Sequence, residues 1–136
     1  LHAPFDALRS EIMPINRKYP LKTLTAAMDA YIQITNRRIS IEYALIRGKN
    51  DSTACAEQLV KLFSGGLYHI NLIPVNNVRE RSFQKTDKKH VLAFAQLLSS
   101  RGLNATVRRE LGSDIDAACG QLRKKRAHAD QTETTR

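Results

Sequence analysis

Residues 39–45 read Ile39-Ser40-Ile41-Glu42-Tyr43-Ala44-Leu45, and every second side chain from Ile39 onward is large and apolar. This alternation, with β-branched and aromatic residues on one side, predicts a strand with one buried face. Gly48 to Ser52 predicts a turn that ends in residue types suited to cap a helix. The segment after it has apolar residues at helical spacing and ends at Gly65-Gly66, so a helix follows the strand.

The strand and helix pattern repeats along the chain. Tyr68 to Ile73 predicts a second strand, stopped by Pro74, and Thr86 or Asp87 can cap the helix that follows it. Leu103 to Arg109 predicts a third strand. Strands that alternate with helices are typical of a parallel sheet with covering helices, so the sequence predicts an α/β fold.

Two helical segments precede the first strand. Ala7 to Met13 predicts a short helical turn that Pro14 stops, because the residue before a proline is pushed away from helical backbone angles. A longer helix is expected to open at Pro20 and to close at Asn36.

The loops that follow the strands should share one edge of the sheet, because crossovers between parallel strands are right-handed. Ligands bind at this edge in such folds. The loops expected there are Leu1 to Asp6, Arg47 to Ser52, Val75 to Thr86 and Glu110 to Leu122.

Composition narrows the class of protein. The 136 residues are 42% hydrophobic and carry a net charge of +9, with a pI near 9.9. A polyanionic partner is favoured, and nucleic acid more than a membrane, since no basic amphipathic helix stands out. No apolar run approaches the roughly 18 residues of a membrane span, so we expect a cytoplasmic protein. The abrupt start at Leu1 leads us to expect the C-terminal portion of a longer protein.

The two cysteines lie in very different surroundings. Cys55 lies on the predicted helix that follows the first strand, three and four residues before Gln58 and Leu59, and we interpret it as a buried or half-buried bystander. Cys119 lies just past the third strand among small residues, with Asp114 and Asp116 nearby, which is a poor place for a structural thiol. Two cysteines are too few to hold an iron–sulfur cluster.

The segment around Cys119 also resembles a known family. Asp114-Ile115-Asp116-Ala117-Ala118-Cys119-Gly120-Gln121-Leu122 is similar to the C-terminal signature of bacterial radical-SAM methyltransferases that modify adenine in ribosomal and transfer RNA. Further blocks that resemble this family, in the family's order, are Leu1-His2-Ala3-Pro4, Ile12 to Asn16, Glu42 to Ile46 and Asn71 to Asn76.

The resemblance implies a fold and a domain arrangement. Residues 1–122 would be the C-terminal half of a partial (β/α) radical-SAM barrel, with parallel strands and covering helices. Residues 123–136, which begin with Arg123-Lys124-Lys125-Arg126, are expected to form a basic, disordered tail.

The resemblance also implies a reaction and its cofactors. Cys119 would be catalytic: it would receive a methyl group from S-adenosylmethionine and become S-methylcysteine, from which the methyl carbon passes to carbon 2 of adenine. The substrates would be large-subunit rRNA and tRNA. The [4Fe-4S] cluster of the full-length enzyme, and its second catalytic cysteine, would have their residues upstream of this chain.

Other site residues follow from the same resemblance. Leu1, His2 and Asn76 match positions that contact S-adenosylmethionine, and no metal ligand is expected in the chain. On sequence alone, Asn76 after a strand is more often a turn residue, and Glu42 is interpreted as pairing with an arginine rather than serving the barrel interior. Basic residues that could contact phosphates are Arg79, Arg81, Lys85, Lys88, Lys89, Arg108, Arg109 and Arg123 to Arg126.

Two alternative functions stay open at this point. One is the related enzyme that methylates carbon 8 of adenine in rRNA and confers antibiotic resistance, although Ile73 to Asn76 and Arg108 to Gly112 look more like the carbon-2 type. The other is a non-catalytic basic RNA-binding module, which would need only the basic surface. We also expect the chain by itself to be inactive and to self-associate through an open sheet edge.

Overall fold

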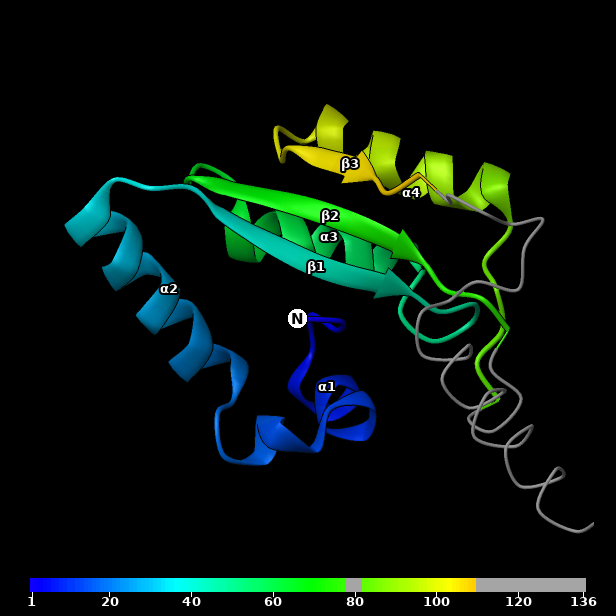
Figure 1. Cartoon of the computed structure of the whole chain (residues 1–136), viewed down its shortest axis with the longest axis horizontal. Coiled ribbons are helices and arrows are strands. Elements are labelled where there is room, and N and C mark those ends of the chain that lie inside the picture. Colours follow the sequence, from blue (N-terminus) through cyan, green and yellow to red (C-terminus); the bar gives the residue numbers. More distant parts are fainter. Residues whose placement is uncertain (78–81, 110–136) are drawn as a thin grey trace, which may run out of the picture.

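Three parallel strands form the centre of the computed structural model, which describes residues 1–77 and 82–109 (Figure 1). They are β1 (Ile39–Leu45), β2 (Tyr68–Pro74) and β3 (Ala105–Val107), in the spatial order β1-β2-β3. Two helices connect them, α3 (Thr53–Phe63) and α4 (Lys88–Ser100). The α/β fold class with a parallel sheet and covering helices is confirmed.

The caps of these helices agree with the sequence. Ser52 precedes α3 and its hydroxyl accepts a hydrogen bond from the Cys55 amide at 3.2 Å. Of the two residues proposed to cap α4, Asp87 is the one that does so, with its carboxylate accepting from the His90 amide at 3.0 Å. Each cap satisfies an amide that the helix itself leaves without a partner.

The third strand is shorter than predicted. We expected residues 103–109, whereas β3 covers only Ala105–Val107. Leu103 is buried, and its amide bonds the carbonyl of Leu98 at the end of α4 instead of joining the ladder. The Arg108 amide still donates to the Leu72 carbonyl at 2.8 Å, so backbone pairing reaches one residue beyond the strand.

The segment before β1 is helical, as the sequence indicates. It consists of α1 (Asp6–Ile12), a 3-10 turn η1 (Pro14–Arg17) and α2 (Leu21–Thr35). Pro14 opens η1 and thereby ends α1. Asn36 closes α2 in the left-handed conformation, with φ of 51° and its amide bonded to the Ile32 carbonyl at 2.7 Å.

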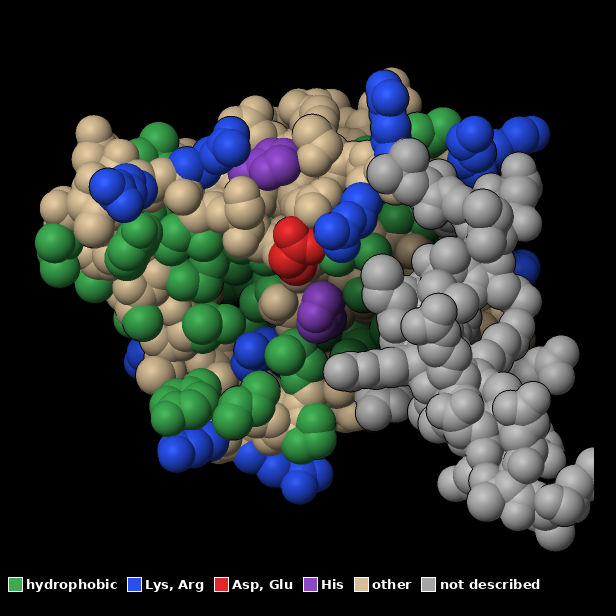
Figure 2. Space-filling model, viewed as in Figure 1, with side chains coloured by type: hydrophobic (Ala, Val, Ile, Leu, Met, Phe, Trp, Pro, Cys, Tyr) green, Lys and Arg blue, Asp and Glu red, His purple; other side chains and the backbone are tan. Residues whose placement is uncertain are grey.

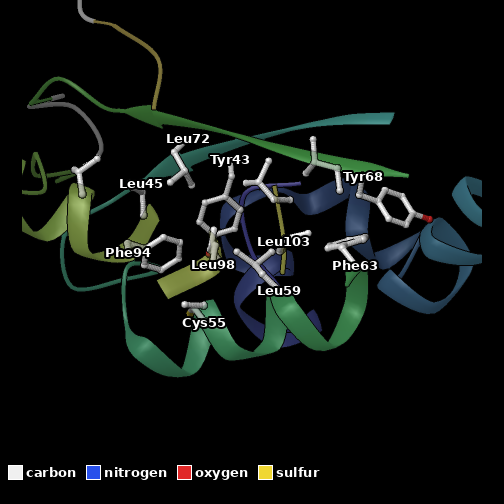
Figure 3. Packing of buried hydrophobic residues seen from close by; sticks show 14 residues of the cluster. Tyr43, Leu45, Cys55, Leu59, Phe63, Tyr68, Leu72, Phe94, Leu98 and Leu103 are labelled. Carbon is white, nitrogen blue, oxygen red and sulfur yellow. The ribbon is translucent and has the colours of Figure 1, made fainter. Parts of the chain in front are cut away.

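One face of the sheet packs against α3 and α4 and forms the hydrophobic core (Figure 3). Tyr43 and Leu72 come from the strands, Leu59 from α3 and Leu98 from α4, and each is fully buried. Burial of such an aliphatic side chain stabilises the fold by about 1.5–3 kcal/mol. Cys55 belongs to the same core and is 3% exposed, which confirms the prediction that this thiol is buried or half-buried.

Within the residues that the structure describes, we find no helix long and apolar enough to cross a membrane.

Candidate functional site

The face of the sheet opposite the core carries polar side chains. Alternation along the strands places Glu42, Asn71 and Thr106 on this face, and the strand register aligns them as neighbours across all three strands. Figure 2 looks onto this face, where an acidic side chain and histidines stand out. We refer to it as the open face.

Hydrogen bonds join side chains across the open face. The Asn71 amide donates to a carboxylate oxygen of Glu42 at 3.0 Å, and the ring nitrogen Nε2 of His69 lies 3.0 Å from the Thr106 hydroxyl oxygen. In residues 1–77 and 82–109, the side chain of Glu42 bonds an asparagine and not the arginine that we expected. Asn71 is its side-chain partner because the strand register sets the two residues directly opposite each other.

Leu1 and His2 lie along β1. The amino group of Leu1 donates to the Glu42 carbonyl at 3.1 Å, and the Ala44 amide donates to Nδ1 of His2 at 3.0 Å. The β1 amide of Ile39 instead bonds the Leu67 carbonyl next to β2. Because backbone groups alternate in direction along a strand, Leu1 and His2 lie on the side of β1 away from β2.

Two buried side chains hold the carbonyls of these first residues. Nε of Arg9 donates to the Leu1 carbonyl at 3.3 Å, and Nδ2 of Asn50 donates to the His2 carbonyl at 2.8 Å. Arg9 is fixed in turn by a bond to Asn16 at 2.6 Å. His2 has φ of 61°, a left-handed angle that costs energy for a residue other than glycine, so its position is imposed by these contacts.

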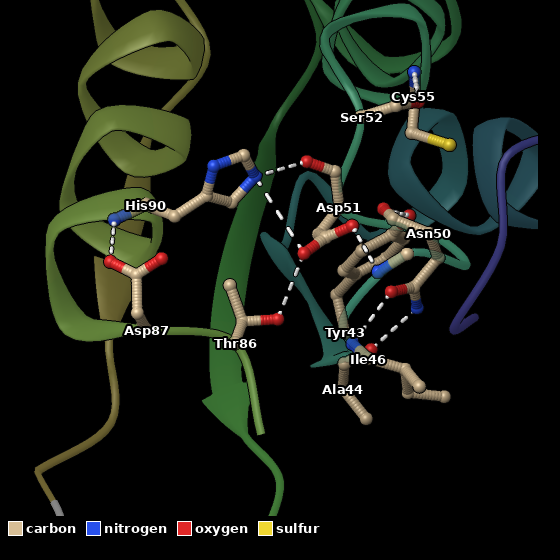
Figure 4. Close-up of polar contacts among 11 residues, drawn as sticks. Tyr43, Ala44, Ile46, Asn50, Asp51, Ser52, Cys55, Thr86, Asp87 and His90 are labelled. Carbon is tan, nitrogen blue, oxygen red and sulfur yellow. Dashed lines mark hydrogen bonds and ion pairs between the residues drawn. The ribbon is translucent and has the colours of Figure 1, made fainter. Parts of the chain in front are cut away.

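Asn50 also organises the turn between β1 and α3 (Figure 4). Its Nδ2 donates to the Ala44 carbonyl at 2.6 Å, and its Oδ1 accepts from the Ile46 amide at 2.7 Å. The Tyr43 hydroxyl donates to the Asn50 carbonyl at 2.8 Å, and burial raises the pKa of that tyrosine. One side chain therefore connects the end of β1 with the segment containing His2.

Asp51 connects the same turn to the start of α4 (Figure 4). Its carboxylate accepts from the Thr86 hydroxyl at 3.0 Å and from the Gly48 amide at 2.9 Å. Nε2 of His90 lies 2.5 Å from the Asp51 carbonyl oxygen, and because a carbonyl only accepts, this nitrogen carries the proton. The loops after β1 and β2 are thus held together at one edge of the sheet.

Asn76 lies at that edge as well. It is exposed and follows β2 by two residues, beyond Pro74. The neighbouring Asn77 accepts from the Lys85 amide at 2.9 Å, which brings the two ends of the intervening loop together. The structure therefore places His2 and Asn76 near the carboxyl edge of the sheet and Leu1 beside the middle of β1, whereas Cys119 lies outside the described residues.

The described residues do not supply a metal centre. No group of three or more His, Cys, Asp or Glu side chains in residues 1–77 and 82–109 could hold an ion. Cys55, the cysteine in this part of the chain, is enclosed in the core. These donors do not fit an iron–sulfur cluster, which requires several converging thiolates.

Comparisons with known proteins show which proteins have a similar sequence and a similar fold. The chain is 56% identical over 125 residues to a protein of Caldanaerobacter subterraneus subsp. tengcongensis named "Probable dual-specificity RNA methyltransferase RlmN", covering 92% of the chain. A protein of the same name from Clostridium botulinum is 52% identical over 124 residues, or 91% of the chain. A crystal structure of a radical SAM methyltransferase from Sphaerobacter thermophilus matches with a TM-score of 0.82 at 49% identity, over 89% of the chain.

The chain belongs to the radical SAM methyltransferase family. It spans 36% of the length of both curated relatives and of the Sphaerobacter structure. A domain of pyruvate-formate lyase-activating enzyme from Bacteroides vulgatus, 18% identical with a TM-score of 0.63, shares the fold. No protein-family profile matches the chain.

The donors on the open face suit the cofactor that gives this family its name. S-adenosylmethionine carries an ammonium, a carboxylate and ribose hydroxyls; the open face offers the Glu42 carboxylate and the Asn71 amide, and the His2 ring lies beside β1 at its border. Sequence reasoning missed Arg9 and Asn50, which hold Leu1 and His2. The turn signal at Gly48 to Ser52 was visible, but its contact with His2 was not.

The protonation of His2 is testable by titration. Burial, followed by the positive charges of the amino terminus and of Arg9, lowers the pKa of His2 below the ordinary value of 6.5, while Glu42 raises it. Nδ1 also accepts the Ala44 amide, which requires the unprotonated ring. We expect histidine ring NMR signals to give His2 a pKa below 6.5, and Glu42→Gln to lower it further.

The free energy of unfolding should depend on pH through the protonation of His2. Between the lowered folded pKa and 6.5 the unfolded chain binds more protons at His2 than the folded chain does, so the contribution of neutral His2 is complete above 6.5 and declines as the pH falls below it. A His2 pKa above 6.5 would contradict this assignment.

Loss of the Asn50 side chain should destabilise the fold. Asn50→Ala leaves the Ile46 amide and the carbonyls of His2 and Ala44 without this partner, so we expect a loss on the order of 3 kcal/mol in the free energy of unfolding. Urea titration measures it. Asn104→Ala, at an exposed position, is the control and should change stability by less than about 0.5 kcal/mol. Equal effects of the two changes would refute the role given to Asn50.

Proposed function

We propose that this chain forms part of an enzyme that methylates carbon 2 of adenine in large-subunit rRNA and tRNA. The observation that carries this proposal is the 56% identity, over 92% of the chain, to a relative named as a dual-specificity RNA methyltransferase. The parallel sheet with its polar open face supports it, because such a face can receive a cofactor and a base. The enzyme would act in the cytoplasm.

His2, Leu1 and Asn76 would hold S-adenosylmethionine at the carboxyl edge of the sheet. His2 is neutral and presents its ring from a backbone that Asn50 fixes, so it can offer a hydrogen bond without adding charge next to a cationic sulfonium. Glu42 and Asn71 are already paired, and together they present a carboxylate and an amide toward the same ligand. When bound, the cofactor supplies the methyl group and the radical chemistry.

Cys119 would be the residue that carries the methyl group. Its thiolate would form a new sulfur–carbon bond with the methyl of the sulfonium, and the thioether S-adenosylhomocysteine would leave. The [4Fe-4S] cluster of the complete enzyme would be held by residues outside this chain, since the described donors do not fit it. Residues 1–122 would form part of the barrel, and residues 123–136 would form a basic tail.

Replacement of each cysteine in the complete enzyme tests this assignment. Cys119→Ala should abolish methylation of RNA, with a loss of at least about 10³-fold, because the atom that would hold the methyl is gone. Cys55→Ala is the matched control and should retain activity, since that thiol lies in the core. The measurement is transfer of labelled methyl to tRNA and an rRNA fragment, with mass analysis of the 114–123 peptide and of the modified base.

The outcomes separate the alternatives. Methylation at carbon 8 would point to the antibiotic-resistance type of enzyme. Full activity of Cys119→Ala, or an unmodified Cys119 in active enzyme, would overturn the mechanism. RNA binding without any methyl transfer would favour the non-catalytic module.

The chain by itself should self-associate. β3 is the edge strand of the described sheet on the side away from Leu1 and His2, and on α2 the residues Tyr31 and Ile34 are 45% and 84% exposed. Exposed edges and apolar surface of this kind favour contacts between copies. Light scattering after gel filtration should give a mass above 15.3 kDa that increases with concentration. A monomer at all concentrations would contradict this expectation.

A further inference from the structure

A basic groove lies where β2, β3 and α4 meet. It is a cavity of about 490 Å³ whose lining includes Pro74 at the end of β2, Val107 at the end of β3 and Val91 of α4. Lys88 and Arg109 are among the basic residues that line it, together with Lys85 and Arg108. The groove therefore has an apolar lining and several cationic side chains.

The carboxylates near the groove already accept hydrogen bonds from other groups of the fold. Asp87 uses its side chain to cap α4 through the His90 amide, and Asp51 accepts from Thr86 and Gly48. The first turn of α4 contributes the partial positive charge of a helix amino terminus. Cationic groups outnumber anionic ones at the groove, so it should attract an anion.

The backbone at the groove is held in place on both sides. Arg109 follows Arg108, whose amide donates to the Leu72 carbonyl at 2.8 Å, while Lys88 is the first residue of the capped helix α4. The side chains of Lys88 and Arg109 therefore extend from backbone that hydrogen bonds hold in place. In Figure 2, Lys and Arg side chains gather at the upper right, over the end of β3 and the start of α4.

We propose that this groove binds the sugar–phosphate backbone of the RNA substrate. The inference rests on the function proposed above and adds the surface that holds the nucleic acid. Arginine and lysine side chains pair with phosphates, and apolar lining can contact ribose and bases. The groove lies at the carboxyl ends of β2 and β3, the edge at which Asn76 also lies, on the side of the sheet that α4 covers, so a base on a backbone held there would pass over this edge to enter the open face.

Charge reversal in the complete enzyme tests the groove. We expect Lys88→Glu/Arg109→Glu to weaken binding of a fluorescent tRNA at least tenfold and to reduce the slope of log affinity against log salt by about 2, because two phosphate contacts are lost. The KM for RNA should rise by a larger factor than kcat falls. The charge-preserving pair Lys88→Arg/Arg109→Lys should keep binding within about threefold of the unchanged enzyme, because the number of positive charges that face the phosphates is the same.

The control has the same change in net charge at remote positions. Lys22→Glu/Lys61→Glu alters exposed residues on α2 and α3 and should leave RNA affinity nearly unchanged. Equal weakening by both double variants would show a general charge effect and overturn the proposal. So would wild-type affinity of Lys88→Glu/Arg109→Glu, or groove-dependent binding to anionic vesicles without binding to tRNA.

The two proposals fail in different ways. If the unchanged enzyme methylates tRNA and the groove variant does so with wild-type affinity, the proposed function stands and the groove does not bind the RNA. If the unchanged enzyme neither binds nor methylates RNA, the proposed function itself is wrong. Thermal unfolding of each variant, compared with its control, separates loss of binding from loss of fold.

Discussion

The amide of Asn50 is the interaction on which the site depends. It is completely buried and satisfies two carbonyls and one amide that the chain brings together where β1 ends. Buried polar backbone groups that lack a partner cost about 1–3 kcal/mol each, so this turn, the end of β1 and the segment at His2 adopt one arrangement together. The Asn50 side chain thus supplies, at the edge of the sheet, the hydrogen bonds that neighbouring strands supply to each other within the sheet.

The two faces of the sheet differ for the same reason: polar groups need hydrogen-bond partners, whereas apolar groups need only to be packed away from water. The face toward α3 and α4 is filled with aliphatic and aromatic groups, among them Tyr43 and Phe94, whose ring centres lie 6.0 Å apart. The opposite face keeps polar groups such as Glu42 and Asn71 within hydrogen-bond reach of each other. Because all three strands run in parallel, their carboxyl ends reach a single edge, and the polar face and the basic groove both open there.

Much of this arrangement could be predicted from the sequence, because local patterns specify it. Strand alternation from Ile39 and helix caps at Ser52 and Asp87 are properties of neighbouring residues, and the structure has them. The start of the third strand was harder to predict. Leu103 has the apolar character of a strand residue, but its amide bonds the Leu98 carbonyl in the turn after α4, beside Gly102 with φ of 82°, so this position belongs to the end of the helix.

The polar contacts of the site could not be predicted, for a related reason. Asn50 and the His2 carbonyl are 48 positions apart, and Arg9 reaches Leu1 from within a helix. Such contacts leave no periodic signal in the sequence. Glu42 shows the same limit: its polar, outward position was foreseen, but the partner depended on the register of β1 against β2.

The buried position of Cys55 gives the fold an internal reporter. A thiol that is 3% exposed, packed between α3 and the sheet, reacts with an alkylating reagent only while that interface is open. Its labelling rate, under conditions where reclosing is faster than alkylation, therefore measures the fraction of time that α3 spends away from the strands. The rate at which this buried thiol is alkylated would therefore report how often the core opens.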